Sequence, residues 1–198
     1  MDKMYDMGGE TVLITGGSRG LGRAMALGFA AQGADIAIVS RKMDSCEETA
    51  EEVRALGAQA LPYAAHVGDW DQVGEMVTAV TSHFGKIDVL INNAGMSPLY
   101  PSLDQVSEEL FDKVMGVNLK GPFRLSALVG KQMAEGDGGS IINVSSTASV
   151  SPSPGAEPYG AAKAGLNAIT RSMAYAYGPK VRVNCIMAGP FLTDISKA

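Results

Sequence analysis

The feature that most constrains the fold of this chain is a regular alternation of short β-forming runs with longer amphipathic segments. The short runs predict strands over Thr11–Thr15, Asp35–Val39, Ala60–Ala64, Ile87–Ile91, Ser140–Val144 and Val181–Ile186. The longer segments carry apolar residues at helical spacing and predict helices over Leu21–Gln32, Met43–Leu56, Trp70–Phe84, Glu108–Met133 and Tyr159–Tyr177. This order predicts an α/β fold built on a parallel sheet.

The predicted strands are apolar on consecutive residues rather than on alternate ones, as in Val12–Ile14 and Val89–Ile91. This pattern is typical of parallel strands that helices cover on both faces, so we expect a doubly wound sheet in three αβα layers. Because 198 residues have room for one such domain and no internal repeat or linker is visible, we expect a single domain over residues 1–198. Right-handed crossovers then place a ligand cleft at the carboxyl ends of the strands.

Composition narrows the classes of function. Hydrophobic residues make up 46% of the chain and the formal net charge is -5, which disfavours disorder and a nucleic-acid-binding surface. No apolar run is long enough to span a membrane and the N-terminus lacks a secretory h-region, so we expect a cytoplasmic protein with no membrane partner. Two cysteines and two histidines form no disulfide framework or zinc spacing, so no metal site is expected.

A glycine-rich turn follows the first predicted strand. Gly16 would allow a tight turn, Gly20 a close approach of the backbone to a pyrophosphate, and Gly22 close packing of the following helix. Ser18 and Leu21 would contact the bound nucleotide. The simpler alternative is a turn with no ligand.

The same residues also match G-x-S-x-G, the nucleophile elbow of serine hydrolases, but that fold needs a later histidine and the last one in this chain is His83.

The end of the second predicted strand indicates which dinucleotide would bind. An NAD-binding cleft expects an acidic residue there, but the chain has Ser40 followed by Arg41, with Arg19 in the glycine-rich turn. Guanidinium groups bind a 2′-phosphate that a carboxylate would repel, so we predict a preference for NADP(H), with NAD(H) also possible. Alternatively, Arg41 and Lys42 are a solvated helix start and Arg19 pairs with a surface acid.

A tyrosine and a lysine are spaced for acid–base chemistry. Tyr159 and Lys163 stand four residues apart, on one face of a predicted helix, where the ammonium would stabilise a phenolate. Such pairs arise by chance, because a lone tyrosine is usually an interfacial aromatic and a lone lysine a solvated charge. However, Ser146 and the run Asn92–Gly95 each follow a predicted strand and would reach the same cleft.

In these motifs the chain resembles the short-chain dehydrogenase/reductase family in its short single-domain form. The resemblance covers about residues 11–195 and rests on Thr15–Gly22, Asn92–Gly95, Asn118, Ser146, Tyr159 with Lys163, and Arg182–Asn184. It implies a Rossmann fold and hydride transfer between NADP(H) and a small carbonyl compound or secondary alcohol. Tyr159 would be the general acid/base, Lys163 would assist it and hold ribose hydroxyls, Ser146 would orient the substrate oxygen, and Asn118 would complete a proton relay.

The resemblance implies further cofactor contacts. These are Asn92, Ala94, Gly95, His66, Val67, Gly189 and Thr193. His66 stands where many relatives have an aspartate that binds the adenine amino group, and Ala188 replaces a usual proline. Asn118 has a simpler reading as a residue that only bends its helix.

The end of the chain also departs from the family pattern. Relatives continue beyond Thr193 with a substrate-covering loop, a helix and a final strand, so we expect either a truncated chain or a natural short form. Self-association as a dimer or tetramer is implied through the helices Glu108–Met133 and Tyr159–Tyr177. Met96–Tyr100 and Thr147–Pro158 would form the wall of the substrate pocket. Two alternatives stay open: an NAD-dependent sugar or polyol dehydrogenase, and a non-enzymatic nucleotide-binding regulator.

Overall fold

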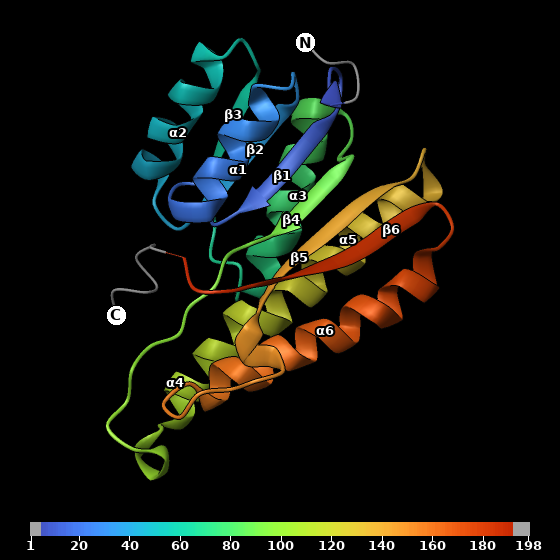
Figure 1. Ribbon diagram of the computed structural model, residues 1–198. Helices are drawn as coiled ribbons and strands as arrows, with labels where there is room; N and C mark the ends of the chain where they lie inside the picture. The colour runs from blue at the N-terminus through green and yellow to red at the C-terminus, as the bar shows by residue number, and fades with distance from the viewer. Residues whose placement is uncertain (1–4, 192–198) are drawn as a thin grey trace.

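The computed structural model describes residues 5–191, which form a parallel sheet between layers of helices (Figure 1). The strands are β1 (Thr11–Thr15), β2 (Asp35–Ser40), β3 (Ala60–Ala64), β4 (Val89–Asn92), β5 (Gly139–Ser146) and β6 (Val181–Ala188). They lie in the order β3-β2-β1-β4-β5-β6, and each neighbouring pair is parallel. The predicted doubly wound sheet is therefore confirmed.

The helices pack on both faces of the sheet. They are α1 (Gly20–Ala30), α2 (Met43–Ala55), α3 (Trp70–Phe84), α4 (Glu108–Met115), α5 (Gly121–Glu135) and α6 (Glu157–Tyr177). Val12 and Ile14 of β1 pack with residues of α1 and α2, whereas Leu13 between them packs with residues of α3, α5 and α6. Because successive strand residues point to opposite faces, this arrangement explains why β1 is apolar on three consecutive residues, Val12–Ile14.

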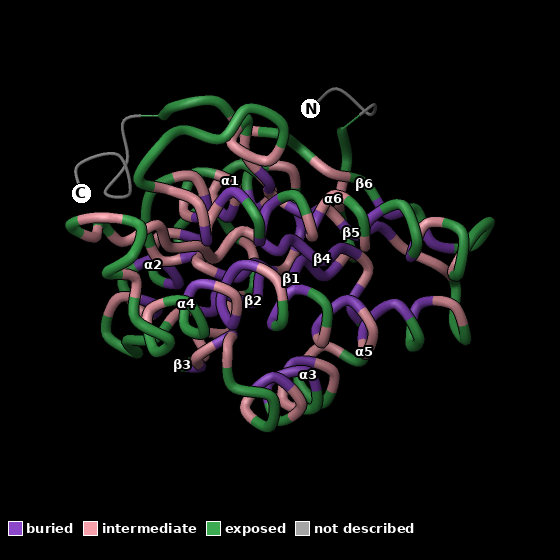
Figure 2. Tube along the Cα trace, turned by 90° about the horizontal axis from the view of Figure 1, so that it is seen from below, coloured by how far each residue is buried: buried purple, intermediate pink, exposed green. Residues whose placement is uncertain are grey.

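Burial is greatest in the middle of the sheet (Figure 2). All five residues of β1 and all four of β4 are buried, while β6 alternates between buried and exposed residues. On β6, Val181 and Val183 join the core, and Arg182, Asn184 and Ile186 on the opposite face are exposed. The centre of the sheet is thus a rigid base for the strand ends.

The expectation of one uninterrupted helix over Glu108–Met133 is wrong in its interior. A π-helical turn, η3 (Gly116–Lys120), separates α4 from α5. Asn118 Nδ2 donates to the carbonyl oxygen of Val114 (2.9 Å), and Gly121 lies so close to the loop after β3 that a Cβ there would be 2.1 Å from the Val67 carbonyl oxygen. Apolar periodicity continues through such a turn, so the pattern alone could not show it.

The order of the strands reverses between β1 and β4, since β2 and β3 lie on one side of β1 and β5 and β6 lie beyond β4. The carboxyl ends of all these parallel strands meet at one edge of the sheet, where ligands bind in open α/β folds. Within the described residues, no helix is long and apolar enough to cross a membrane.

Candidate functional site

The turn after β1 has a shape that requires glycine. Gly16 and Gly20 have positive φ angles of 64° and 54°. A Cβ on Gly22 would lie 2.1 Å from the Gly16 carbonyl oxygen, so α1 could not pack this closely on the turn with any other residue. Within residues 5–191, no side-chain bond from the N-cap residue, Arg19, caps α1, and the backbone N–H groups of a first helical turn can bind an anion.

The residues after β4 hold the glycine-rich turn in place. Asn93 Nδ2 donates to the carbonyl oxygens of Thr15 (3.0 Å) and Gly16 (3.2 Å). The Thr15 hydroxyl accepts from the backbone N–H groups of Asn93 (3.0 Å) and Ala94 (3.1 Å). The ends of β1 and β4 are therefore joined by hydrogen bonds at the point where the strand order reverses.

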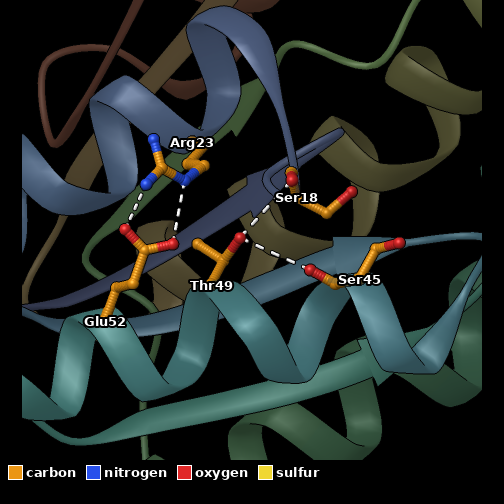
Figure 3. Close-up of polar contacts among 5 residues, drawn as sticks. All are labelled: Ser18, Arg23, Ser45, Thr49 and Glu52. Atoms are coloured by element: carbon orange, nitrogen blue, oxygen red, sulfur yellow. Dashed lines mark hydrogen bonds and ion pairs between the residues drawn. The ribbon is translucent and has the colours of Figure 1, made fainter.

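Helix α2 supports the same turn from the other side (Figure 3). The Thr49 hydroxyl, which is buried, lies 3.4 Å from the carbonyl oxygen of Ser18 and 3.4 Å from that of Ser45. Arg23 of α1 forms an ion pair with Glu52 of α2, with 3.0 Å between Arg23 Nε and Glu52 Oε1. Contacts with α2 thus hold both the turn and the start of α1.

A cleft of about 580 Å³ lies at the carboxyl ends of β1 to β4. Most of the predicted cofactor contacts line it: Gly16, Ser18, Arg19, Gly20, Leu21, Ser40, Arg41, His66, Val67, Ala94 and Gly95. Arg19, Arg41 and Lys42 contribute positive charge to this wall, and no described lining residue is a carboxylate. The cleft has a size typical of ligand sites and an electrostatic preference for anions.

The predicted catalytic residues lie on β5 and α6. Ser146 is the last residue of β5, and its hydroxyl oxygen accepts from the Ala148 N–H (3.2 Å). Tyr159 is in the first turn of α6, and Lys163 follows one turn later. Lys163 Nζ lies 5.7 Å from the centre of the Tyr159 ring and donates to the Val144 carbonyl oxygen (2.8 Å).

Lys163 is buried, with 3% of its surface exposed. Burial lowers the pKa of its ammonium group to about 8, and the nearby Cys185 opposes that shift weakly. Keeping the positive charge of Lys163 in this buried position therefore lowers the stability of the folded protein. The same charge can stabilise a phenolate or bind polar groups of a ligand.

The cleft and the catalytic residues meet at Gly95. A Cβ at this position would lie 3.0 Å from Asn118 Oδ1 and 3.7 Å from Lys163 Nζ, so glycine lets the wall of the cleft lie directly against both. Asn118 holds this wall, because its side chain accepts from the Met96 N–H (3.3 Å) and donates to the Met96 carbonyl oxygen (2.8 Å). The π-helical turn therefore carries the residue that connects α4 and α5 to the cleft.

Other predicted residues lie in different positions. Asn92 points below the cleft, where its Nδ2 donates to the side chains of Ser126 (2.9 Å) and Asn143 (2.8 Å). This differs from the expectation that Asn92 lines the cleft, since neighbouring strand residues face opposite ways and Asn93 is the one exposed to it. Gly189 is exposed after β6 and is not part of the cleft wall, and Thr193 lies outside the described residues.

Several cleft residues were missed as cofactor contacts in the sequence. They are Lys42, Ser45, Ala65, Asn93 and Val117, together with Met96, Ser97 and Pro98, which were assigned only to the substrate wall. Asn93 follows a strand, so the signal that selected Asn92 applied to it equally. Val117 carried no signal, because its position depends on the π-helical turn.

Comparisons with known proteins agree with this geometry. The sequence pattern of the family described as short chain dehydrogenase matches residues 10–198. The chain is 32% identical to Dehydrogenase/reductase SDR family member 4 of Pongo abelii, covering 100% of this chain and 71% of that protein. It is 37% identical to the 3-oxoacyl-(acyl-carrier-protein) reductase of Thermotoga maritima, covering 96% and 77%. The solved structure of NAD+-bound xylitol dehydrogenase matches with a TM-score of 0.88 and 32% identity, covering 92% and 71%.

Proposed function

This chain belongs to the short-chain dehydrogenase family, and we propose that it is an oxidoreductase that prefers NADP(H) and interconverts a secondary alcohol and its ketone. The observation that carries the proposal is the junction at Gly95, where the wall of an anion-attracting cleft lies against the buried Lys163. A dinucleotide in this cleft would therefore have its redox end beside Tyr159 and Lys163.

The residues of the cleft fit a dinucleotide. The glycine-rich turn presents backbone N–H groups at the start of α1 to a pyrophosphate. Gly16 keeps the turn open, because a Cβ there would lie 3.0 Å from the Ala94 Cα. When bound, the dinucleotide supplies or accepts the hydride.

The charge of the cleft supports the preference for NADP(H). Arg41 and Lys42 follow β2, where a ribose is held in this fold, and Arg19 lines the same cleft. A guanidinium binds a phosphate through two parallel hydrogen bonds. In contrast, no acidic residue in the described lining offers an acceptor to the free 2′- and 3′-hydroxyls of an NAD ribose.

The residues of the chain divide the chemistry between them. Tyr159 gives a proton to the substrate oxygen in reduction and takes it back in oxidation. Lys163 stabilises the phenolate with its charge, and Ser146 orients the substrate oxygen with its hydroxyl. Ser145 is the weaker choice for that role, because its hydroxyl donates to the Lys163 carbonyl oxygen (3.3 Å) on the buried side of β5. The part of Asn118 in a proton relay stays a prediction.

A second candidate is an NAD-dependent sugar or polyol dehydrogenase. The observation that favours it is the similarity to xylitol dehydrogenase, whose solved structure contains NAD+. A nucleotide-binding regulator is less well supported, because Lys163 lies beside the Tyr159 ring and the chain also has Ser146 at the end of β5. A single-domain organisation, a cytoplasmic location and self-association stay predictions.

A substrate panel separates these candidates. Purified protein is assayed with ketones and aldehydes in the presence of NADPH or NADH, and with sugars and polyols in the presence of NADP+ or NAD+, by absorbance of the reduced nicotinamide. We expect ketone reduction with a higher kcat/KM for NADPH. Faster polyol oxidation with NAD+ would favour the second candidate, and tight nucleotide binding without turnover would favour the regulator.

A further inference from the structure

The loop between β4 and α4 is connected to the start of α6 by a pair of side chains, Tyr100 and Glu157. The Tyr100 hydroxyl donates to the Glu157 carboxylate and accepts from the Glu157 backbone N–H (3.0 Å). The same carboxylate accepts from the Gly155 N–H, with 3.1 Å to Oε2. We call this reciprocal arrangement the Tyr100–Glu157 clasp.

Each partner of the clasp stands two residues from a functional element. Met96, Ser97 and Pro98 line the cleft, and Tyr100 follows two residues later. Glu157 is the first residue of α6, two residues before Tyr159. The clasp therefore joins the substrate side of the cleft wall to the helical turn that carries the predicted acid/base, Tyr159. The segments that connect the clasp to these two elements are short and have few free torsions.

The loop has little else to hold it. Leu99 and Leu103 are 70% and 63% exposed, so they provide little packing. Within the described residues, the hydrogen bonds that join positions 97–106 to another part of the chain are those between Tyr100 and Glu157. Loss of the clasp would leave this wall of the cleft free to move.

The charges of the two partners suit the clasp at neutral pH. Burial, together with the bond to Glu157, raises the pKa of Tyr100, so the phenol stays a donor. The hydrogen bond from Tyr100 lowers the pKa of Glu157, so its carboxylate stays an ionised acceptor. A hydrogen bond to an ionised group is stronger than one between neutral groups.

We propose that the Tyr100–Glu157 clasp is a positioning device, which holds the substrate-side wall of the cleft and the Tyr159 phenol in the arrangement that turnover requires. The inference rests on the proposed oxidoreductase function. Neither residue takes part in proton transfer; both act through the elements that they connect. Small displacements of reacting groups lower rates strongly, so a modest loosening has a measurable effect.

The test compares matched hydroxyl deletions. Tyr100→Phe keeps the ring and removes the clasp, and kcat/KM for the ketone should fall about tenfold while the NADPH dissociation constant changes less than about twofold. Tyr177→Phe is the control, because the Tyr177 hydroxyl donates to the Ala127 carbonyl oxygen (3.2 Å) between α6 and α5, far along the helix from Tyr159. This control should retain the turnover of the unmodified chain.

Variants at the other partner add a readout that a loss of stability would not reproduce. Glu157→Gln keeps a carbonyl oxygen that accepts from Tyr100 and should retain most of the turnover. Glu157→Ala removes the carboxylate but keeps the backbone N–H that donates to Tyr100, so its turnover should lie between those of Glu157→Gln and Tyr100→Phe. The double variant Tyr100→Phe/Glu157→Ala should be no slower than Tyr100→Phe, because the Tyr100 hydroxyl takes part in both hydrogen bonds between the two residues.

Hydrogen exchange tests the clasp without relying on catalysis. The Gly160 N–H donates to the Ala156 carbonyl oxygen (2.8 Å) in the first turn of α6, and it should exchange faster in Tyr100→Phe than in Tyr177→Phe. An unmodified chain that turns over no substrate would reject the proposed function, and the exchange rate alone would then decide whether the clasp holds α6. In an active chain, unchanged turnover in Tyr100→Phe, or an equal loss of NADPH affinity, would overturn the positioning role.

Discussion

The two halves of the cleft are held in different ways. In the nucleotide half, at the ends of β1 to β3, the site is made mainly of backbone and depends on glycine conformations within one continuous turn. In the catalytic half, at the ends of β4 to β6, the functional side chains come from separate elements and are held by bonds such as Lys163 Nζ to the Val144 carbonyl oxygen. We therefore propose that nucleotide binding depends mainly on local backbone conformation, which contacts from Asn93 and Thr49 support, and that the chemistry depends on tertiary contacts between side chains.

The interior below each half shows the same difference. The core that packs against α1 and α2 is formed by apolar residues and buried Cys46. Below the catalytic half, Asn92 donates to Ser126 and Asn143, and Asn143 Nδ2 donates to the Thr170 hydroxyl (2.8 Å), all with 5% exposure or less. Directional bonds of this kind fix the register of α5 and α6 against the sheet more tightly than apolar contact does.

The largest expected effect is a loss of turnover that leaves nucleotide binding nearly unchanged. Tyr159→Phe removes the proton donor but leaves the nucleotide half intact, so turnover should fall by at least about 100-fold while NADPH affinity changes less than about twofold. Steady-state kinetics and a fluorescence titration with NADPH measure the two quantities. Turnover close to that of the unmodified chain would mean that the proton comes from another group.

A pH-dependent change in stability should mark the catalytic half. The folded pKa of Lys163 is about 8, below its ordinary value of 10.5, so between these values the unfolded chain binds more protons and stability rises with pH. The penalty for burying the charge is complete below pH 8 and disappears towards pH 10.5. Lys163→Met has no buried charge and so no such penalty. The difference between its free energy of unfolding and that of the unmodified chain should therefore shrink by about 3 kcal/mol from pH 8 to pH 10.5.

Denaturant unfolding of the ligand-free unmodified and Lys163→Met chains at a series of pH values measures this difference. Titrations that the two chains share cancel when their free energies of unfolding are subtracted. A difference that stays constant from pH 7 to pH 10.5 would show that burial does not lower the pKa of Lys163.

The complementary change should affect only the nucleotide half. Arg41→Ala removes a cation from the cleft wall, so the NADPH dissociation constant should rise about tenfold, with NADH binding and turnover at saturating NADPH little changed. Calorimetric titration with both nucleotides gives the ratio of affinities. An unchanged ratio would reject the role of Arg41 in binding the 2′-phosphate.

The smallest expected effect concerns the support that α2 gives to the glycine-rich turn. Thr49→Val removes a buried hydroxyl beside the Ser18 carbonyl oxygen, which should cost about 1 kcal/mol of stability and weaken NADPH binding about twofold. Thr78→Val is the matched control, because the Thr78 hydroxyl donates within its own helix to the Gly74 carbonyl oxygen (3.1 Å). Equal NADPH affinity in the two variants would show that α2 does not hold the turn.

The same contrast explains what the sequence could predict. The predicted strands agree with those observed to within a few residues, because apolar runs and the turns between them are local signals. The glycine-rich turn and the Tyr159–Lys163 spacing were visible for the same reason. The side-chain partners of the catalytic half were not, since Tyr100 and Glu157 are 57 residues apart and no periodic pattern links them.

The position of Asn118 shows the limit most clearly. The sequence identified it through a resemblance and offered helix bending as an alternative, and the structure has it in a π-helical turn that also bonds the Met96 backbone. Gly121, which follows that turn, lies against the loop after β3, and local patterns do not encode such a tertiary contact. Helix geometry that depends on tertiary contacts has to be observed.

A crystal structure of this chain with NADP+ bound would test the nucleotide half and the catalytic half of the cleft together. We expect the pyrophosphate at the glycine-rich turn, the 2′-phosphate beside Arg41, and the nicotinamide end against Gly95 within reach of Tyr159 and Lys163. A dinucleotide bound outside this cleft, or a Tyr159 hydroxyl that points away from the nicotinamide, would contradict this expectation.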